Sequence, residues 1–170
     1  MSAGTILFEA KGLCKSFGPT RANVDVDLTL RRGEVHGLVG ENGSGKSTLL
    51  SQIAGIAVGD AGTMQMSGET YAPRSPLDAY ERGIGTVVQE LGVIGNLPAG
   101  VNVFVGRHRR FTRAGIVDTK KINEEVRCVA QEWGLEDLPL NRLAQTMNVE
   151  GRKQVELLRA LAVNPELLIL

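Results

Sequence analysis

The chain has 170 residues, of which 42% are hydrophobic and 22% charged, a balance that is typical of a soluble globular protein and not of a disordered one. Its 19 Lys and Arg residues equal its 19 Asp and Glu residues, so a nucleic acid or an anionic membrane could be bound only through a local patch. No stretch approaches the roughly 20 apolar residues of a membrane-spanning helix, and the N-terminus, MSAGTILFEAKGL, lacks the pattern of a secretory signal.

The first third of the chain carries strand and turn patterns. Strands are expected at residues 5–9 and 26–30, the second with alternating apolar residues. Residues 15–23 contain a Gly-Pro pair and indicate a turn, and RRGE at 31–34 indicates another. The short apolar run VHGLVG at 35–40 is predicted to be a strand of the kind that is buried in a parallel sheet.

Helical and hairpin patterns follow. Apolar residues at helical spacing predict a helix at 47–56, and glycines on either side of TMQMS predict a β-hairpin at 59–69. A further helix is expected at 74–83, ending near Gly83. The β-rich run IGTVVQ then predicts a short strand that begins at Ile84.

The pattern becomes helical after residue 90. Helices are expected at 122–133 and at 149–163, the second ended by Pro165. The apolar run at 166–170 is predicted to be a strand, and because it reaches the last residue we expect the domain to be truncated. The residues expected to face the core are Ile122, Val126, Val129 and Trp133 in the first helix and Val155, Leu158, Leu161 and Ala162 in the second.

Residues 40–47 match the pattern G-x-x-x-x-G-K-[ST] between a predicted strand and a predicted helix, which is the context of a phosphate-binding loop. Glycines let the backbone N–H groups approach phosphate oxygens, and the helix N-terminus adds partial positive charge. Lys46 is predicted to reach the β- and γ-phosphates, and the Ser47 hydroxyl to complete a Mg²⁺ shell. The alternative is a Gly-rich turn that binds nothing. The predicted nucleotide-binding residues of this loop are Gly40, Glu41, Asn42, Gly43, Ser44, Gly45, Lys46, Ser47 and Thr48.

The sequence around the loop is also distinctive: FEAKGLCKSFGP precedes it, RRGEVHGLVGENGSGKSTLLSQIAG contains it, and GIGTVVQE follows. These segments resemble the ATPase domain of ATP-binding-cassette (ABC) proteins. The segment GEVHGLVGENGSGKSTLL is most similar to importers of simple sugars such as ribose, xylose or galactose. Two later segments, ERGIGTVVQELGVIGNLPAGVNVFVGR and QVELLRALAVNPELLIL, are similar to the same subfamily, so the resemblance covers nearly the whole chain.

The resemblance implies an α/β fold, with a P-loop NTPase (RecA-like) core, an antiparallel β-lobe and an inserted α-helical subdomain. Residues 1–89 are expected to form the β-lobe and the first part of the core, and residues 90–151 the helical subdomain. Residues 152–170 are expected to return to the core and to end in a truncated Walker B strand. In the sugar importers two such cassettes are commonly fused, and this chain would be the front portion of the first.

The resemblance also assigns residues outside the loop. Phe17 matches the aromatic residue that stacks on adenine, a role that suits a flat apolar face, although a lone Phe between two turns can also belong to a core. Gln89 matches the catalytic Q-loop glutamine, which contacts Mg²⁺ together with Ser47 and also contacts the attacking water. His36, inside the strand expected before the loop, is interpreted as a satisfied sheet or surface histidine and not as a catalytic one.

Two departures from the family pattern bear on hydrolysis. Residues 147–151, Met-Asn-Val-Glu-Gly, stand where the family has a signature close to LSGGQ. Asn148 can still cap the following helix, but Glu150 introduces a carboxylate where backbone should approach phosphate. The Walker B carboxylates and the switch histidine would follow residue 170. We therefore expect the parent protein to be an ATPase and this chain alone to be hydrolysis-incompetent.

The resemblance predicts an ATP- and Mg²⁺-dependent subunit of an ABC importer for a simple sugar. Its expected partners are a second ATPase cassette, transmembrane permease subunits and, indirectly, a periplasmic or extracellular sugar-binding protein. Its expected location is cytoplasmic and peripheral, on the inner face of the cell membrane. Two alternatives stay open: a non-hydrolysing cassette that binds ATP structurally, and a soluble ABC relative that acts on nucleic acid or ribosomes. The zero net charge argues against the last, so no nucleic acid is expected.

Two smaller features complete the sequence. The basic run Arg107-His108-Arg109-Arg110 is interpreted as a solvated loop, with a functional patch as the alternative. Cys14 and Cys128 lie far apart without a C-x-x-C pattern, which favours buried or neutral thiols in a reducing compartment.

Overall fold

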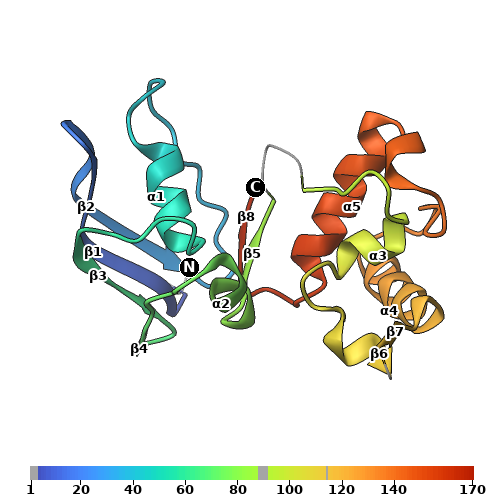
Figure 1. The fold of residues 1–170 in the computed structure, drawn as a ribbon. Coiled ribbons are helices and arrows are strands. Elements are labelled where there is room, and N and C mark those ends of the chain that lie inside the picture. The colour runs from blue at the N-terminus through green and yellow to red at the C-terminus, as the bar shows by residue number, and fades with distance from the viewer. Residues whose placement is uncertain (1–3, 88–91, 114) are drawn as a thin grey trace. The chain divides into compact units, whose positions relative to one another are not determined.

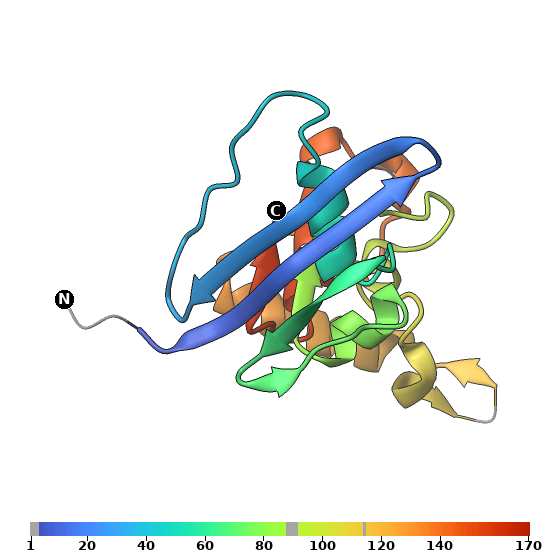
Figure 2. The ribbon, with the colours of Figure 1, turned by 90° about the vertical axis from the view of Figure 1, so that its left-hand side faces the viewer.

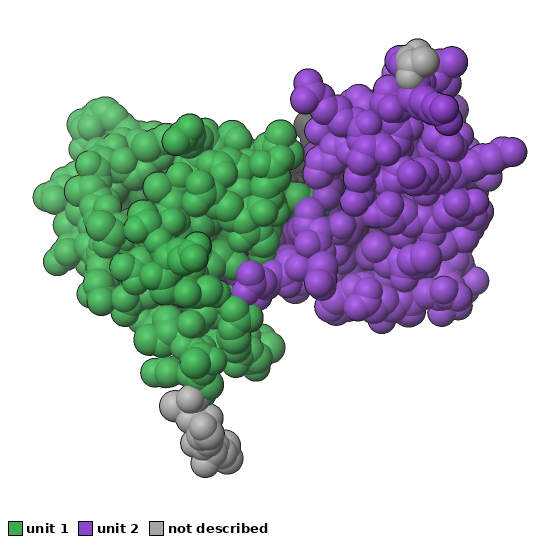
Figure 3. Space-filling model, turned by 90° about the horizontal axis from the view of Figure 1, so that it is seen from below, with its two compact units in different colours: residues 1–84 green, residues 85–170 purple. Residues whose placement is uncertain are grey.

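The structure is a computed structural model that describes residues 4–87, 92–113 and 115–170. It divides into two compact units, Met1–Ile84 and Gly85–Leu170, which are coloured separately in Figure 3. The first unit contains a four-stranded sheet and two helices, and the second contains three α-helices with short strands. The two units are described below one at a time.

The first unit is built on an antiparallel sheet with strand order β2-β1-β3-β4 (Figure 2). The predicted strands are present but longer than expected, and the predicted turn at 15–23 is confined to two residues, Gly18 and Pro19, because Phe17 already pairs with Thr20. The four strands are β1 (Ile6–Phe17), β2 (Thr20–Arg31), β3 (Ala61–Met66) and β4 (Glu69–Thr70). Strands β3 and β4 are the expected hairpin.

Two helices accompany this sheet, α1 (Lys46–Ile53) and α2 (Pro76–Glu81), both at the predicted places. The core of the unit is centred on Phe8 and Tyr71, whose rings meet edge to face with centroids 5.9 Å apart. The Tyr71 hydroxyl donates a hydrogen bond to the Ile53 carbonyl, 2.6 Å away, and burial raises the pKa of this tyrosine. The end of α1 is thereby tied to the core.

The strand predicted at 35–40 is not formed. Residues 31–40 are exposed along their whole length, with Val39 at 92% exposure, and none of the sheets among the described residues includes residues 35–40. A strand exists only where a neighbouring segment pairs with its N–H and C=O groups. The apolar run identifies a segment that is suited to a sheet, but it carries no information about the partner.

The second unit contains the helices that were predicted in the last third of the chain. The short strand that begins at Ile84 pairs with the strand predicted near the end of the chain. A two-residue hairpin, β6 with β7, is an addition to the prediction, which had expected strand signals to end near residue 90. The elements are β5 (Ile84–Thr86), α3 (Ala99–Val103), η1 (His108–Phe111), β6 (Thr112–Arg113), β7 (Ile116–Val117), α4 (Thr119–Glu132), η2 (Ala144–Thr146), α5 (Val149–Leu161) and β8 (Leu167–Ile169), as labelled in Figure 1.

The core of the second unit lies between α3, α4 and α5. The predicted core faces of α4 and α5 are confirmed, with one exception. Trp133 is 52% exposed, because α4 ends at Glu132 and the tryptophan, as the capping residue, leaves the helical face. The buried cluster consists of Ala99, Val103, Phe104, Phe111, Ile122, Val126, Ala130, Leu138, Leu140, Met147, Val155 and Leu158.

Two further findings concern membrane-spanning helices and the cysteines. Among the described residues, every helix is too short or too polar to cross a bilayer. Both cysteines are free, Cys14 half-buried and Cys128 exposed, so of the two expected alternatives, buried or neutral thiols, burial does not apply to Cys128. The residue occupies a position on the outer face of α4, where helical spacing turns it away from the core.

Candidate nucleotide-binding site

The predicted phosphate-binding loop ends in a glycine that no other residue could replace without strain. Gly45 adopts a left-handed conformation, with φ of 89°, directly before α1. A Cβ atom at this position would lie 2.2 Å from the Ala22 carbonyl oxygen, so both the conformation and the space require glycine. Gly43 is also left-handed, with φ of 84°, but nothing lies within 4 Å of its missing Cβ. The two glycines are therefore needed for different reasons.

Lys46 is held inside the loop that precedes it. Its ammonium group donates hydrogen bonds to the carbonyl oxygens of Gly40 and Glu41 at 2.8 and 2.7 Å, and it lies 3.4 Å from the Ser44 hydroxyl. The loop is thus curved around the cation. A Cβ atom on Gly40 would meet the Ser44 hydroxyl at 2.8 Å, so the inside of the curve has no room for a side chain there. The loop's own oxygen atoms therefore satisfy the Lys46 ammonium group.

The first turn of α1 places the other predicted residues. The helix begins at Lys46, and the Leu49 N–H donates to the Gly45 carbonyl at 2.9 Å. Ser47 is exposed and Thr48 is half-buried, while Leu49 is buried and anchors the helix to the core. The exposed hydroxyl of Ser47 at a helix N-terminus suits the Mg²⁺ ligand role that was predicted for it.

Two buried polar residues support the loop and were not predicted. The Asn23 side-chain amide, on β2, donates to the Gly45 carbonyl at 3.2 Å. Its carbonyl oxygen accepts a hydrogen bond from the Gln52 amide of α1 at 3.1 Å. Both side chains are nearly inaccessible to solvent. No spacing rule connects positions 23, 45 and 52, and the unusual occurrence of a glutamine on the apolar face of a helix is the only sequence signal that could have found this arrangement.

Phe17 lies at the end of β1, and its side chain is 54% exposed, so the alternative of a core position is excluded. The Lys15 ammonium lies 5.5 Å from the centre of the ring. Asp60 holds this strand end by accepting bonds from Lys15 at 2.9 Å and from the Ser16 N–H at 2.6 Å. The hydrogen bond from Lys15 and then that from the Ser16 N–H hold the pKa of Asp60 below its usual value. An exposed aromatic face is what stacking on a base requires, and that role stays a prediction.

His36 is a partnered surface residue, as expected. Its Nδ1 atom lies 2.9 Å from the Glu34 carboxylate, and the other oxygen of that carboxylate accepts a bond from the Arg31 N–H. The hydrogen bond with His36, followed by the one from Arg31, lowers the pKa of Glu34. The imidazole is therefore joined through Glu34 to the turn at 31–34.

Gln89 lies outside the described residues. Gly92, the first described residue after it, is held by α5 within the second unit. The Gly92 carbonyl accepts a hydrogen bond of 2.5 Å from the Arg159 guanidinium of α5. A Cβ atom on Gly92 would lie 3.0 Å from the Glu156 side chain, so α5 approaches the backbone closely. Neither contact was predicted, because the residues are more than 60 positions apart.

The departure from the family signature lies at the start of α5, also in the second unit. Asn148 caps the helix by accepting a hydrogen bond from the Gly151 N–H at 2.8 Å, which confirms the expected cap. Met147 is buried beside it, and Glu150 is exposed. The residues of the predicted signature therefore form an ordinary capped helix start, with a carboxylate in its first turn.

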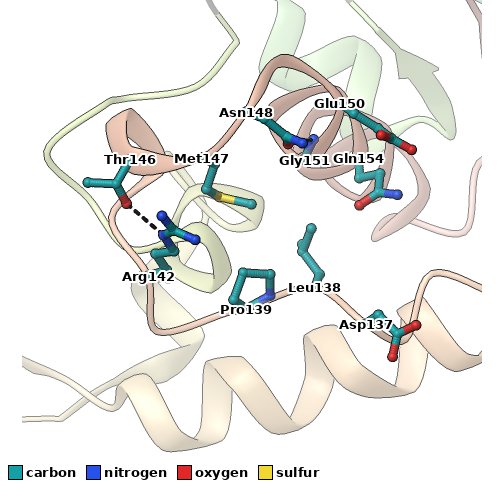
Figure 4. Close-up of a pocket in the computed structure, with 10 residues that line it drawn as sticks. All are labelled: Asp137, Leu138, Pro139, Arg142, Thr146, Met147, Asn148, Glu150, Gly151 and Gln154. Carbon is teal, nitrogen blue, oxygen red and sulfur yellow. Dashed lines mark hydrogen bonds between the residues drawn. The ribbon is translucent and has the colours of Figure 1, made fainter.

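A pocket of about 380 Å³ opens beside this helix start (Figure 4). The Arg142 guanidinium is oriented by a hydrogen bond of 3.0 Å to the Thr146 hydroxyl. Arg142 contributes a positive charge, and Asp137 and Glu150 contribute carboxylates to the opposite side (Figure 4). The lining residues are Asp137, Leu138, Pro139, Arg142, Thr146, Met147, Asn148, Glu150, Gly151 and Gln154.

A Gly-rich loop that curves around a lysine, directly before a helix and next to an antiparallel sheet, is the arrangement that was predicted for a nucleotide-binding cassette. A family model described as ABC transporter matches residues 24–170, and the chain belongs to this family. The fold agrees with solved ATP-binding cassettes of ABC transporters. One in its ADP conformation has a TM-score of 0.80 at 23% identity, covering 96% of this chain and 67% of that one. A nucleotide-free cassette has a TM-score of 0.81 at 23% identity, covering 96% and 68%. The predicted α/β P-loop fold is confirmed.

Curated relatives are similar along nearly the whole chain. The ribose import ATP-binding protein RbsA of Caldanaerobacter subterraneus is 37% identical over 166 residues, which are 96% of this chain and 33% of that protein. A putative ribose/galactose/methyl galactoside import ATP-binding protein of Ralstonia nicotianae is 36% identical over 169 residues, 99% of this chain and 32% of that protein. The chain therefore spans about a third of the length of these curated relatives. The predicted similarity to the sugar importers is confirmed.

Proposed function

We propose that this chain binds Mg-ATP through residues 40–48 and forms part of the ATP-binding subunit of an importer of a simple sugar. The position of the Lys46 ammonium inside the loop carries this proposal. The carbonyl oxygens that it contacts are neutral acceptors, and a phosphate oxygen is a stronger, charged acceptor. When phosphate binds, the Lys46 ammonium would therefore exchange these two carbonyl oxygens for phosphate oxygens, and the loop backbone would keep its curve.

The remaining residues of the site have defined tasks in this proposal. Ser47 holds Mg²⁺ from the first turn of α1, and Gln89 contributes to the same ion and to the position of the attacking water. Phe17 offers its exposed face to adenine, since aromatic faces bind bases at a low cost in conformational entropy. When bound, Mg²⁺ neutralises charge on the β- and γ-phosphates. Lys46 and the metal would supply positive charge, and the other residues of the site would supply position.

The wider assignment rests on the relatives that are named as sugar-import ATP-binding proteins. By analogy, we expect a second cassette, a membrane-embedded permease and an external sugar-binding protein as partners. The subunit would lie in the cytoplasm, on the inner face of the membrane. ATP binding and hydrolysis by the longer protein would drive uptake of the sugar.

A second candidate is a cassette that binds ATP without turning it over, and Glu150 favours it. This carboxylate is exposed in the first turn of α5, where the family signature approaches phosphate. Two negative charges in close approach repel each other, and so any phosphate brought to this surface would be bound weakly. In this second candidate the chain binds Mg-ATP but does not hydrolyse it.

Calorimetric titration of Mg-ATP tests the proposal on wild type, Lys46→Ala and the matched control Lys153→Ala. Loss of a charge-assisted contact of about 1.5–3 kcal/mol predicts that the Kd of Lys46→Ala rises by about ten- to a hundredfold. Lys153 is exposed on α5 and outside the proposed site, so its variant should bind as wild type does. Equal affinities of wild type and Lys46→Ala, with both proteins folded, would refute the phosphate-binding role. Turnover measured in the same samples, and in the longer protein, separates the two candidates.

A further inference from the structure

The charges of the chain balance only as a whole. Residues 107–121 contain six of the 19 Lys and Arg residues but only one of the 19 Asp and Glu residues, Asp118. This segment forms η1, the β6–β7 hairpin and the start of α4 in the second unit. Residues 107–121 are therefore a local concentration of positive charge in a chain whose net charge is zero.

Two of the six cations serve the fold. The Arg110 guanidinium lies 4.8 Å from the ring centres of both Phe104 and Phe111, and it pairs with Glu125. Arg107 lies over Phe104 at 5.4 Å and donates to the carbonyl oxygen of Arg159 on α5. These two arginines are explained by packing against the aromatic pair.

The other four cations have no such role. The side chains of Arg109, Arg113, Lys120 and Lys121 are exposed, and within the part of the chain that the structure describes they have no hydrogen-bond or ion-pair partner. The structure thus divides the six cations into two that pack against the aromatic pair and four that have no partner among the described residues. Only these four are available to a partner.

The positions of Lys120 and Lys121 are unfavourable for the helix that carries them. They occupy the first turn of α4, whose positive dipole end disfavours cations, and that turn contains no acidic residue. The Asp118 side chain caps the helix through the Lys121 N–H at 3.1 Å and offsets only part of this repulsion. The helix dipole therefore does not account for the two lysines.

An apolar residue stands among the four cations. Ile116 on β7 is 75% exposed, while its neighbour Val117 packs against the core of the unit. The hairpin that presents Ile116 has two residues in each strand and projects from the helices of the second unit (Figure 2). A short projecting element with an apolar side chain and surrounding cations has the composition of a membrane-interface contact.

We propose that this surface, formed by Arg109, Arg113, Ile116, Lys120 and Lys121, binds the anionic headgroups of a lipid bilayer. The cations would lie at the phosphate level and the isoleucine would enter the headgroup region. An acidic protein segment would satisfy the cations but would leave the exposed isoleucine unexplained, so the lipid surface is favoured. This inference goes beyond nucleotide binding and does not depend on it.

Sedimentation with vesicles tests the inference on the 170-residue chain without nucleotide. Vesicles of phosphatidylglycerol and phosphatidylcholine in equal amounts are compared with pure phosphatidylcholine, at low and high salt. We expect binding to the anionic vesicles only, weakened by salt, and a loss of about fivefold for each cation removed. Lys120→Gln with Lys121→Gln should therefore bind roughly 25-fold more weakly, by the same estimate. Ile116→Ser should weaken binding at both salt concentrations.

The matched control is Arg152→Gln with Lys153→Gln, which removes two exposed cations near the start of α5. It should bind vesicles as wild type does. Thermal unfolding of the α4 double variant should show unchanged or higher stability, because the repulsion from the helix dipole is relieved. Equal losses in the two double variants would overturn the inference. So would equal binding to neutral vesicles, or binding to polyglutamate or RNA through the same lysines without binding to anionic vesicles.

Discussion

Gly43 and Gly45 both adopt the left-handed backbone conformation, but only Gly45 has other atoms close to the position of its missing Cβ. Substitution of either by alanine places a side chain in the left-handed region, which costs about 1–2 kcal/mol. Gly45→Ala additionally drives a Cβ atom against the backbone of Ala22, at 2.2 Å, and against Asn23. We expect urea denaturation to show a clearly larger loss of stability for Gly45→Ala than for Gly43→Ala. Similar losses would mean that β2 can move away from the loop.

The buried pair Asn23 and Gln52 allows a double-mutant cycle. Asn23→Leu leaves the Gln52 amide without its partner, and we expect the free energy of unfolding to fall by about 1–3 kcal/mol. Gln52→Leu should be destabilising for the same reason. The double variant removes both polar side chains, while the Gly45 carbonyl keeps its bond from the Leu49 N–H, so stability should return toward that of wild type. Additive losses in chemical denaturation would contradict a coupled pair.

At the scale of an element, α2 is held at its start by reciprocal hydrogen bonds. The Ser75 hydroxyl accepts from the Asp78 N–H, and the Asp78 carboxylate accepts from the Arg74 N–H and from the Arg82 guanidinium. The bond from the Arg74 N–H, followed by that from Arg82, lowers the pKa of Asp78. The ionised form is therefore favoured in the folded state.

A pH dependence follows from this lowered pKa. Because the folded pKa lies below the unfolded value of about 3.9, the contribution of Asp78 is complete above that pH and is lost as the pH falls through the folded value. Asp78→Asn should thus be less stable than wild type at neutral pH, and the difference should shrink below about pH 4. Urea denaturation at several pH values measures this. A difference that stays constant with pH would show that the carboxylate charge is not involved.

At the scale of the molecule, the two units have separate cores. Phe104 is fully buried in the core of the second unit, and Phe104→Ala should cost about 3–5 kcal/mol there. Hydrogen exchange followed by mass spectrometry should show lost amide protection mainly in residues 85–170, with residues 4–84 less affected. Equal loss of protection in both units would indicate a single cooperative transition.

The prediction from the sequence was most accurate where a pattern is contained in one short segment. The loop at 40–47 and the capped start of α5 at Asn148 were placed correctly, because a few neighbouring residues define each. Trp133 was wrongly assigned to the core, since periodicity continues past the point where α4 ends. The hairpin of β6 and β7 was missed because two-residue strands are too short to show a period.

By itself, the sequence determined the family, the glycine-rich loop before α1 and the apolar faces of α4 and α5, since each depends on the order of residues along a few turns of chain. Only the tertiary structure decided that residues 35–40 lack a strand partner among the described residues, and that Asn23 reaches Gly45. It also showed that Arg107 and Arg110 lie against the Phe104 ring, which the basic run by itself does not reveal. These outcomes depend on which distant segments meet, and hydrogen bonding and packing between such segments leave no period in the sequence.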